Sequence, residues 1–368
     1  MSFDRIRHQD AAVRLLRAAV ARDRLSHALL FVGPRGTGKG LAAAELAKLL
    51  FCESPRGSGP DDLDPCDACS HCRRVDRRAH PDLYWFRKEP DRNDFRLPLV
   101  TRREGENGTP LWLTVTVNES VVLMPMEARR TVTVLDDAER MNEEAANALL
   151  KSLEEPSAHA VLVLLCADAS RLPGTVLSRC QWVRFRGLPA EFLAAKVKEL
   201  APAGASAEEV AYVSRLAGGS IEQALHLVGG GLWDLKKRIV GALAGLDEAS
   251  ALSVAGEVET WARTRARGEK AKVGSPEETA LRRDSARLAL AAAASAMRDA
   301  AVVAERGTPA VPLVNADQGD AVASLAAWGP DALARAVDLL ADAQEQIARY
   351  VHPELATENA FVQVSRLG

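Results

Sequence analysis

The sequence predicts an α/β protein with a parallel sheet in its first half and a mostly helical second half. Short apolar runs at 27–33, 131–140 and 159–168 alternate with segments of helical periodicity. This alternation is typical of a parallel sheet that helices cover on both faces. From about residue 187 the strand patterns stop, and helical segments rich in alanine follow. The chain has 368 residues, which suits two or three domains.

Composition and charge exclude several classes of protein. The formal net charge is -3, so the chain has no overall positive field for nucleic acid, and any contact with DNA must be local or shared with partners. The N-terminal stretch MSFDRIRHQD has no apolar core of a signal peptide, and no run of about eighteen uncharged apolar residues occurs. We therefore expect a cytoplasmic protein that does not enter a membrane.

The first strand and its neighbours frame a glycine-rich loop. Residues 11–22 have helical periodicity, 27–33 form a buried strand, and 40–51 consist of good helix formers. The loop GPRGTGKG, residues 33–40, matches the P-loop pattern except at its last position. We expect its N–H groups to face phosphate oxygens at the start of the helix.

The P-loop residues predict a degenerate nucleotide site. Gly33, Gly36 and Gly38 allow the tight loop, and Lys39 reaches the outer phosphates. The next position ordinarily carries a hydroxyl that binds Mg²⁺, but Gly40 has no side-chain oxygen. The sequence leaves open whether ATP or ADP still binds.

Two acids end the second strand. Asp136 and Asp137 match a Walker B pair, in which one carboxylate holds Mg²⁺ and the other orients the attacking water. Two acids at a solvated strand end are the simpler alternative, which the upstream P-loop disfavours. The segment 142–156 predicts a helix that has Asn142 as its N-cap and ends before Pro156.

Four cysteines have the spacing of a zinc site. Cys52, Cys66, Cys69 and Cys72 form C-x13-C-x2-C-x2-C. Four thiolates suit tetrahedral Zn²⁺ in a structural site, because no position is left for water. The alternative is that they are small apolar residues in a core, and the polar surroundings DPCDACSHC disfavour it. His71 is a weaker competing ligand.

Two further groups of residues have simpler interpretations. Helical spacing places Arg73, Arg74, Arg77 and Arg78 largely on one side, facing either a phosphate backbone or, more commonly for such clusters, solvent. Cys166 and Cys180 are expected to be buried small hydrophobic residues.

Residues 89–119 predict a β-hairpin insertion around the turn signal Asn107-Gly108.

The order of these motifs resembles the clamp-loader branch of AAA+ proteins of bacterial DNA polymerase III. The resemblance is carried by GPRGTGKG, the four cysteines, HPD at 80–82, DDAERMNEEAANALLKSLEEP and TVLSRCQWVRF. It covers about residues 5–84 and 120–229 densely, is weaker near VHPELATENAFV, and does not extend over 85–119. It implies a RecA-like AAA+ domain, a small helical lid and a helical collar. The corresponding boundaries are 1–186, with the zinc module at 52–72, then 187–229 and 230–368.

Within this family the substitutions favour a subunit that does not hydrolyse ATP over the gamma/tau motor type. Cys166 and Ala167 stand at the sensor 1 position, where the family usually has Thr or Asn, and Glu222 replaces the sensor 2 arginine. Asp137 stands where the motor has glutamate. Arg179, in the motif SRC, matches the arginine finger that reaches ATP on a neighbouring subunit.

The resemblance also implies partners. These are the gamma/tau and delta subunits in a five-membered ring and, through that ring, the sliding clamp and primed DNA. Two other hypotheses stay open: an active gamma/tau-type ATPase and, less favoured because of the net charge, a stand-alone zinc-dependent DNA-binding module.

Overall fold

The computed structural model describes residues 3–57, 59–87, 100–104, 110–201, 204–268, 274–306, 313–349 and 351–368. The chain divides into two compact units, Met1–Pro189 and Ala190–Gly368. The division into 1–186, 187–229 and 230–368 stays a prediction.

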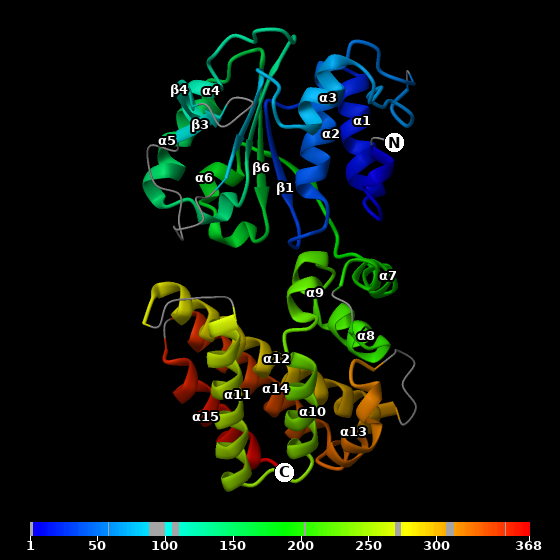
Figure 1. The fold of residues 1–368 in the computed structure, drawn as a ribbon, viewed down its shortest axis with the longest axis vertical. Helices are drawn as coiled ribbons and strands as arrows, with labels where there is room; N and C mark the ends of the chain where they lie inside the picture. The colour runs from blue at the N-terminus through cyan, green and yellow to red at the C-terminus, as the bar shows by residue number, and fades with distance from the viewer. Residues whose placement is uncertain are drawn as a thin grey trace. The chain divides into compact units, whose positions relative to one another are not determined.

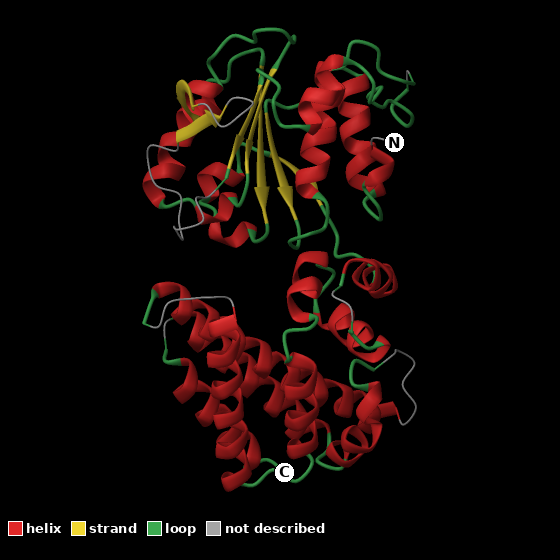
Figure 2. Cartoon of the chain, in the orientation of Figure 1, coloured by secondary structure: helices red, strands yellow, loops and turns green. Residues whose placement is uncertain are grey.

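The first unit is built on a five-stranded parallel sheet (Figure 2). Its strands occur in the order β2-β5-β6-β1-β7, and each neighbouring pair runs parallel. Their bounds are Ala28–Val32 for β1, Leu83–Phe86 for β2, Thr131–Leu135 for β5, Ala160–Cys166 for β6 and Gln181–Arg184 for β7. The central strands are almost completely buried, as expected for a sheet covered on both faces. This is the AAA+ fold that the sequence predicts.

Helices cover the two faces of this sheet as separate layers (Figure 1). One layer contains α1 (Asp10–Ala21), α2 (Lys39–Phe51) and α3 (Ser70–Asp76). The other contains α4 (Val117–Ser120), α5 (Glu143–Glu154) and α6 (Gly174–Leu177). The predicted N-cap of α5 is confirmed, because Asn142 Oδ1 accepts a hydrogen bond of 2.9 Å from the Ala145 N–H.

The two outer strands, β2 and β7, are elements that the sequence analysis did not predict. Each strand has four residues, and in β7 the side chains of Gln181 and Arg184 are exposed. The apolar run of each strand is therefore too short to predict a strand. The antiparallel pairing predicted in the insertion is confirmed by β3 (Val100–Glu104) and β4 (Pro110–Thr116). Residues 88–99 and the predicted turn at Asn107-Gly108 lie outside the described residues.

The described part of the second unit consists of helices and loops (Figure 2). Its helices are α7 (Ala190–Leu200), α8 (Ala207–Leu216), α9 (Ile221–Leu227), α10 (Leu232–Leu243), α11 (Glu248–Gly268), α12 (Pro276–Arg306), α13 (Gly319–Ala326), α14 (Pro330–Ala348) and α15 (Pro353–Ser365). The main core of this unit joins residues of α10 to α15. Four short 3₁₀ helices complete the described elements of the chain: η1 (Phe3–Arg5), η2 (Ala138–Arg140), η3 (Ala169–Arg171) and η4 (Ala316–Gln318). Of the helices described, none combines the length and the hydropathy that a bilayer-spanning segment needs.

Candidate functional site

The glycine-rich loop lies between β1 and α2, as a P-loop requires. A Cβ atom on Gly33 would lie 2.2 Å from the carbonyl oxygen of Phe185, so no larger residue fits there. Gly38 has φ 97° and Gly36 has φ 69°, a region that glycine enters without steric cost. These glycines let the loop turn sharply and start α2 at Lys39.

The side chain of Lys39 is held by the loop itself. Its Nζ donates to the carbonyl oxygens of Gly33 at 2.5 Å and Pro34 at 2.7 Å. Burial lowers the pKa of Lys39, and the negative charge of Glu139 partly opposes that effect. In this conformation the ammonium group of Lys39 is bound by carbonyl oxygens of its own loop. A phosphate must displace these carbonyl oxygens to bind Lys39.

The two acids after β5 both have arginine partners. Asp136 Oδ2 lies 3.3 Å from Nε of Arg87, and Asp137 Oδ1 accepts a hydrogen bond of 2.6 Å from Arg35. Burial raises the pKa of Asp136, and the charge of Arg87 opposes this shift. Both carboxylates are therefore engaged by guanidinium groups in this structure.

A third acid, Glu139 in η2, joins this network. Its side chain accepts hydrogen bonds from Arg35 at 3.4 Å and from the Ala167 N–H at 3.2 Å. The network thus connects the P-loop, the turn after β5 and the end of β6. The sequence analysis missed Arg35, Arg87 and Glu139. Glu139 is only two residues beyond Asp137, but nothing in that spacing indicates that its side chain turns towards β6.

The residues at the start of α2 do not fit a magnesium ion. Gly40 has no ligand oxygen, and a Cβ atom placed on it would lie 3.7 Å from Cζ2 of Trp85 and 3.8 Å from Cδ1 of Leu165. Asp136, the acid that would hold the ion, is already paired with Arg87. The glycine loop has the geometry to hold phosphate. Of the two residues that would bind Mg²⁺, Gly40 has no ligand oxygen and Asp136 is paired with Arg87.

The residues that the resemblance assigns to the two sensor positions are a buried thiol and an exposed carboxylate. Cys166 ends β6, is fully buried, and has its pKa raised to about 12 by burial and by the charge of Glu139. Glu222 is exposed in the first turn of α9, in the second unit.

Cys166 and Cys180 are both buried within one apolar cluster, as predicted.

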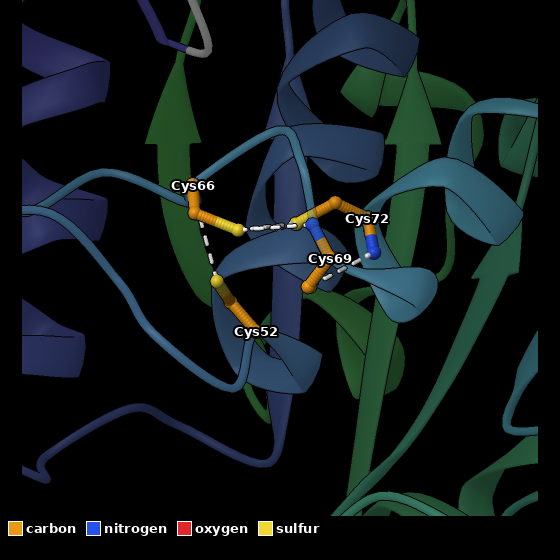
Figure 3. A group of neighbouring side chains, drawn as sticks. All are labelled: Cys52, Cys66, Cys69 and Cys72. Atoms are coloured by element: carbon orange, nitrogen blue, oxygen red, sulfur yellow. Dashed lines mark hydrogen bonds between the residues drawn. The ribbon is translucent and has the colours of Figure 1, made fainter.

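The four cysteines converge on one point beyond the end of α2 (Figure 3). Their sulfur atoms all lie within 4.8 Å of one another, and the Sγ atoms of Cys66 and Cys72 are 3.9 Å apart. Four Zn–S bonds of about 2.3 Å in a tetrahedron place sulfurs roughly 3.8 Å apart, so this set fits Zn²⁺.

Local structure prepares these thiols as ligands. Cys52 follows the last residue of α2, and Cys69 is the N-cap of α3, with its side chain accepting from the Cys72 N–H. Burial opposes ionisation of Cys66, but the N–H groups of Ala68 and Cys69 donate to its sulfur and help lower its pKa to about 6. A thiolate at this position is ready to bind a metal.

A buried ion network attaches this cysteine module to the P-loop helix. Lys48 of α2 is 1% exposed, and its Nζ lies 3.2 Å from Glu45, 3.2 Å from Asp67 and 2.6 Å from Asp76. Asp67 belongs to the cysteine-rich turn and Asp76 to α3. The cation therefore holds three segments together.

His71 is directed to a different group of residues. Its Nδ1 lies 2.7 Å from Nε2 of His80, and its Nε2 lies 3.2 Å from Glu53. Among the described residues it groups with His80 and Glu127 rather than with the four cysteines. Since the Asp82 N–H donates to Nδ1 of His80, the proton of the neutral His80 ring is on Nε2, which then donates to His71.

The HPD motif has a structural role in this protein. The carboxylate of Asp82 accepts hydrogen bonds from the N–H groups of Met126, Glu127 and Ala128, at 2.6, 3.0 and 2.8 Å. The ring of His80 stacks on Phe51 with centroids 4.3 Å apart. Together these contacts hold the chain that enters β5.

The predicted one-sided cluster of four arginines is wrong. Helix α3 ends at Asp76, with Arg77 as its C-cap, and Arg78 has φ 54°, so Arg78 leaves the helical path. Arg74 forms an ion pair with Glu127, whereas the guanidinium of Arg78 stacks over Trp85 at 4.2 Å. Arg73, Arg77 and Arg78 are exposed, whereas Arg74 is half-buried. The tertiary contacts thus divide the group.

Arg179 lies between α6 and β7. Its guanidinium pairs with Glu154 at 2.6 Å and donates to the carbonyl oxygen of Thr175 at 3.0 Å. The side chain is 35% exposed. Its contacts are with α5 and α6, and none is with the P-loop of its own chain among the residues described.

Comparisons with known proteins agree on one family. The model of the family described as "DNA polymerase III, delta subunit" matches residues 8–189. The delta' subunit of Bacillus subtilis is 33% identical over 180 residues, covering 49% of this chain and 48% of that protein. The delta' subunit of Pseudomonas aeruginosa is 34% identical over 217 residues, covering 58% and 60%. The tau subunit of Salmonella typhimurium is 30% identical over 254 residues, covering 67% and 36%.

The matched stretches span between 36% and 60% of the length of these curated relatives. The residues that the family model matches, 8–189, include the glycine-rich loop, the four cysteines and the acid pair. The chain therefore belongs to the clamp-loader family of DNA polymerase III, and delta' subunits are among its relatives in that family.

Proposed function

We propose that this chain is a delta'-type clamp-loader subunit that does not hydrolyse ATP. The observation that carries this proposal is the network of ion pairs between arginines and acids around the P-loop. Arg35 engages Asp137 and Glu139, Arg87 engages Asp136, and position 40 has no hydroxyl. In an active site of this class the first acid and the hydroxyl hold Mg²⁺ and a further residue orients water.

In this proposal the chain contributes to catalysis through Arg179. Its guanidinium reaches the ATP bound by a neighbouring subunit and neutralises charge that develops on the γ-phosphate. The partial exposure of Arg179 supports this role. Among the described residues Glu154 is its one acidic partner, and one surface ion pair contributes only about 0–1 kcal/mol and exchanges readily. The cysteine module binds structural Zn²⁺, and the partners are gamma/tau and delta subunits, the sliding clamp and primed DNA.

An active gamma/tau-type subunit is the second candidate, because tau subunits are also among the relatives. Two measurements separate the candidates. The purified chain is assayed for ATP hydrolysis, and it is mixed with gamma/tau and delta subunits and the complex is weighed by native mass spectrometry. We expect no hydrolysis above background and incorporation of the chain into a ring. Turnover by the chain alone supports the motor candidate, and failure to enter the complex contradicts both.

A further inference from the structure

Arg87 lies where the first acid of a P-loop site ordinarily meets its metal ion. Its Nε is 3.3 Å from Oδ2 of Asp136. Asp136 follows β5 directly, and its backbone N–H donates to the carbonyl oxygen of Phe86, the residue before Arg87. The pairing of β2 with β5 therefore places this guanidinium against the acid.

A second guanidinium lies close by. Trp85 has Arg78 at 4.2 Å and Arg87 at 5.9 Å from its ring centre. The same ring lies 3.7 Å from the position of a Cβ atom on Gly40. Trp85 thus brings both cations close to the start of α2, beside the glycine loop.

The charges around this ring do not cancel. Arg87 pairs with Asp136, but Arg78 forms no ion pair with a carboxylate among the residues that the structure describes. One guanidinium charge is therefore left over Trp85, the ring that lies next to Gly40 at the start of α2. Guanidinium groups bind phosphate oxygens in a bidentate geometry and keep their charge at any physiological pH.

We propose that Arg78 and Arg87 replace Mg²⁺, so that this loop binds the phosphates of a nucleotide without a metal ion. The inference rests on the proposed function, in which the loop keeps a phosphate site but loses hydrolysis. The ligand chemistry is a di- or triphosphate group, which a nucleotide or inorganic pyrophosphate can supply. Binding requires Lys39 to exchange its carbonyl partners for phosphate oxygens, and no bond of the ligand is broken.

The test is a calorimetric titration of the full chain with ATP, ADP and pyrophosphate. Each ligand is titrated in metal-depleted buffer and again with added Mg²⁺, without a chelator that would attack the cysteine site. We expect affinities that agree within about threefold between the two conditions. Tighter binding of the nucleotides than of pyrophosphate identifies a nucleotide as the ligand, and equal binding identifies the phosphate group alone.

Variants separate the two arginines from the general charge of the protein. Arg78→Gln and Arg87→Gln should each weaken binding in metal-depleted buffer about tenfold. Arg77→Gln, which removes an exposed neighbouring charge, should leave it unchanged. Arg87→Lys keeps the positive charge beside Asp136 but loses the bidentate geometry, so it should recover only part of the affinity that Arg87→Gln loses, and it covers the case that Arg87→Gln folds poorly.

Two results overturn the inference: no binding of any of the three ligands, or binding that Mg²⁺ tightens more than about tenfold. Full affinity in both glutamine variants, with their fold verified by circular dichroism, also overturns it. These results leave the proposed function standing, because assembly and hydrolysis test that function separately.

Discussion

Arg35 of the P-loop donates a hydrogen bond of 2.6 Å to Asp137, the second acid after β5. In the Walker B pair that these acids resemble, the second acid orients the attacking water, whereas here its carboxylate is engaged by a guanidinium. Asp137 also has φ 57°, an uncommon conformation for a residue other than glycine. The acids after β5 are thus paired with arginines of the same chain.

We predict that Gly40→Thr does not restore ATP hydrolysis. A Cβ atom at this position meets only ordinary van der Waals neighbours at 3.7 and 3.8 Å, so the variant should fold. It supplies the missing hydroxyl, but Asp136, Asp137 and the sensor positions stay unchanged. Steady-state assays should show both proteins at background. Turnover on the order of 1 s⁻¹ in either protein contradicts the proposal.

The cysteine module should contain about one zinc ion per chain, as measured by inductively coupled plasma mass spectrometry. Cys69→Ser removes one of four thiolates and should release the ion. Structural zinc contributes roughly 10–16 kcal/mol of apparent binding free energy in small fingers, so the module should unfold locally. Cys180→Ala, a buried cysteine outside the cluster, should keep its zinc. A parent protein free of metal, with an intact fold, would show that the assignment is wrong.

Arg179→Ala should slow clamp-dependent ATP turnover in the reconstituted complex without changing zinc content or assembly. An arginine finger is worth about 10³ to 10⁵ in rate at its own site, although other active sites in the ring hide part of the loss. Arg179→Lys should rescue poorly, because an ammonium group cannot reproduce the planar guanidinium. Arg171→Ala, an exposed arginine on η3, is the matched control. Normal turnover by an intact complex with Arg179→Ala reduces the role of the chain to a scaffold.

Asp82→Asn should lower the free energy of unfolding by about 3 kcal/mol, because a neutral amide replaces a carboxylate that accepts three backbone hydrogen bonds. Urea denaturation measures the change. The control is Asp61→Asn on the exposed loop before the second cysteine, for which we expect a change within about 0.5 kcal/mol. Equal stability of the two variants would mean that the segment before β5 is held by other contacts.

Much of the fold followed from local pattern. The continuous apolar runs of β1, β5 and β6 predict buried parallel strands, and Asn142 marks the start of α5, because each of these signals lies within a few adjacent residues. The cysteine spacing likewise predicts the metal module. The loss of the hydroxyl at Gly40 is visible in the sequence alone.

Only the tertiary structure decided which side chains contact the acids beside the glycine-rich loop. Arg87 meets Asp136 because two strands far apart in sequence pair side by side, and Arg35 reaches acids more than a hundred residues away. Arg78 leaves its predicted cluster because α3 stops after Asp76 and the chain turns with a positive φ. Sequence spacing reports neighbours along one helix or strand. It does not report which side chains meet when separate strands are brought together, and in this protein those contacts decide which groups surround the glycine-rich loop.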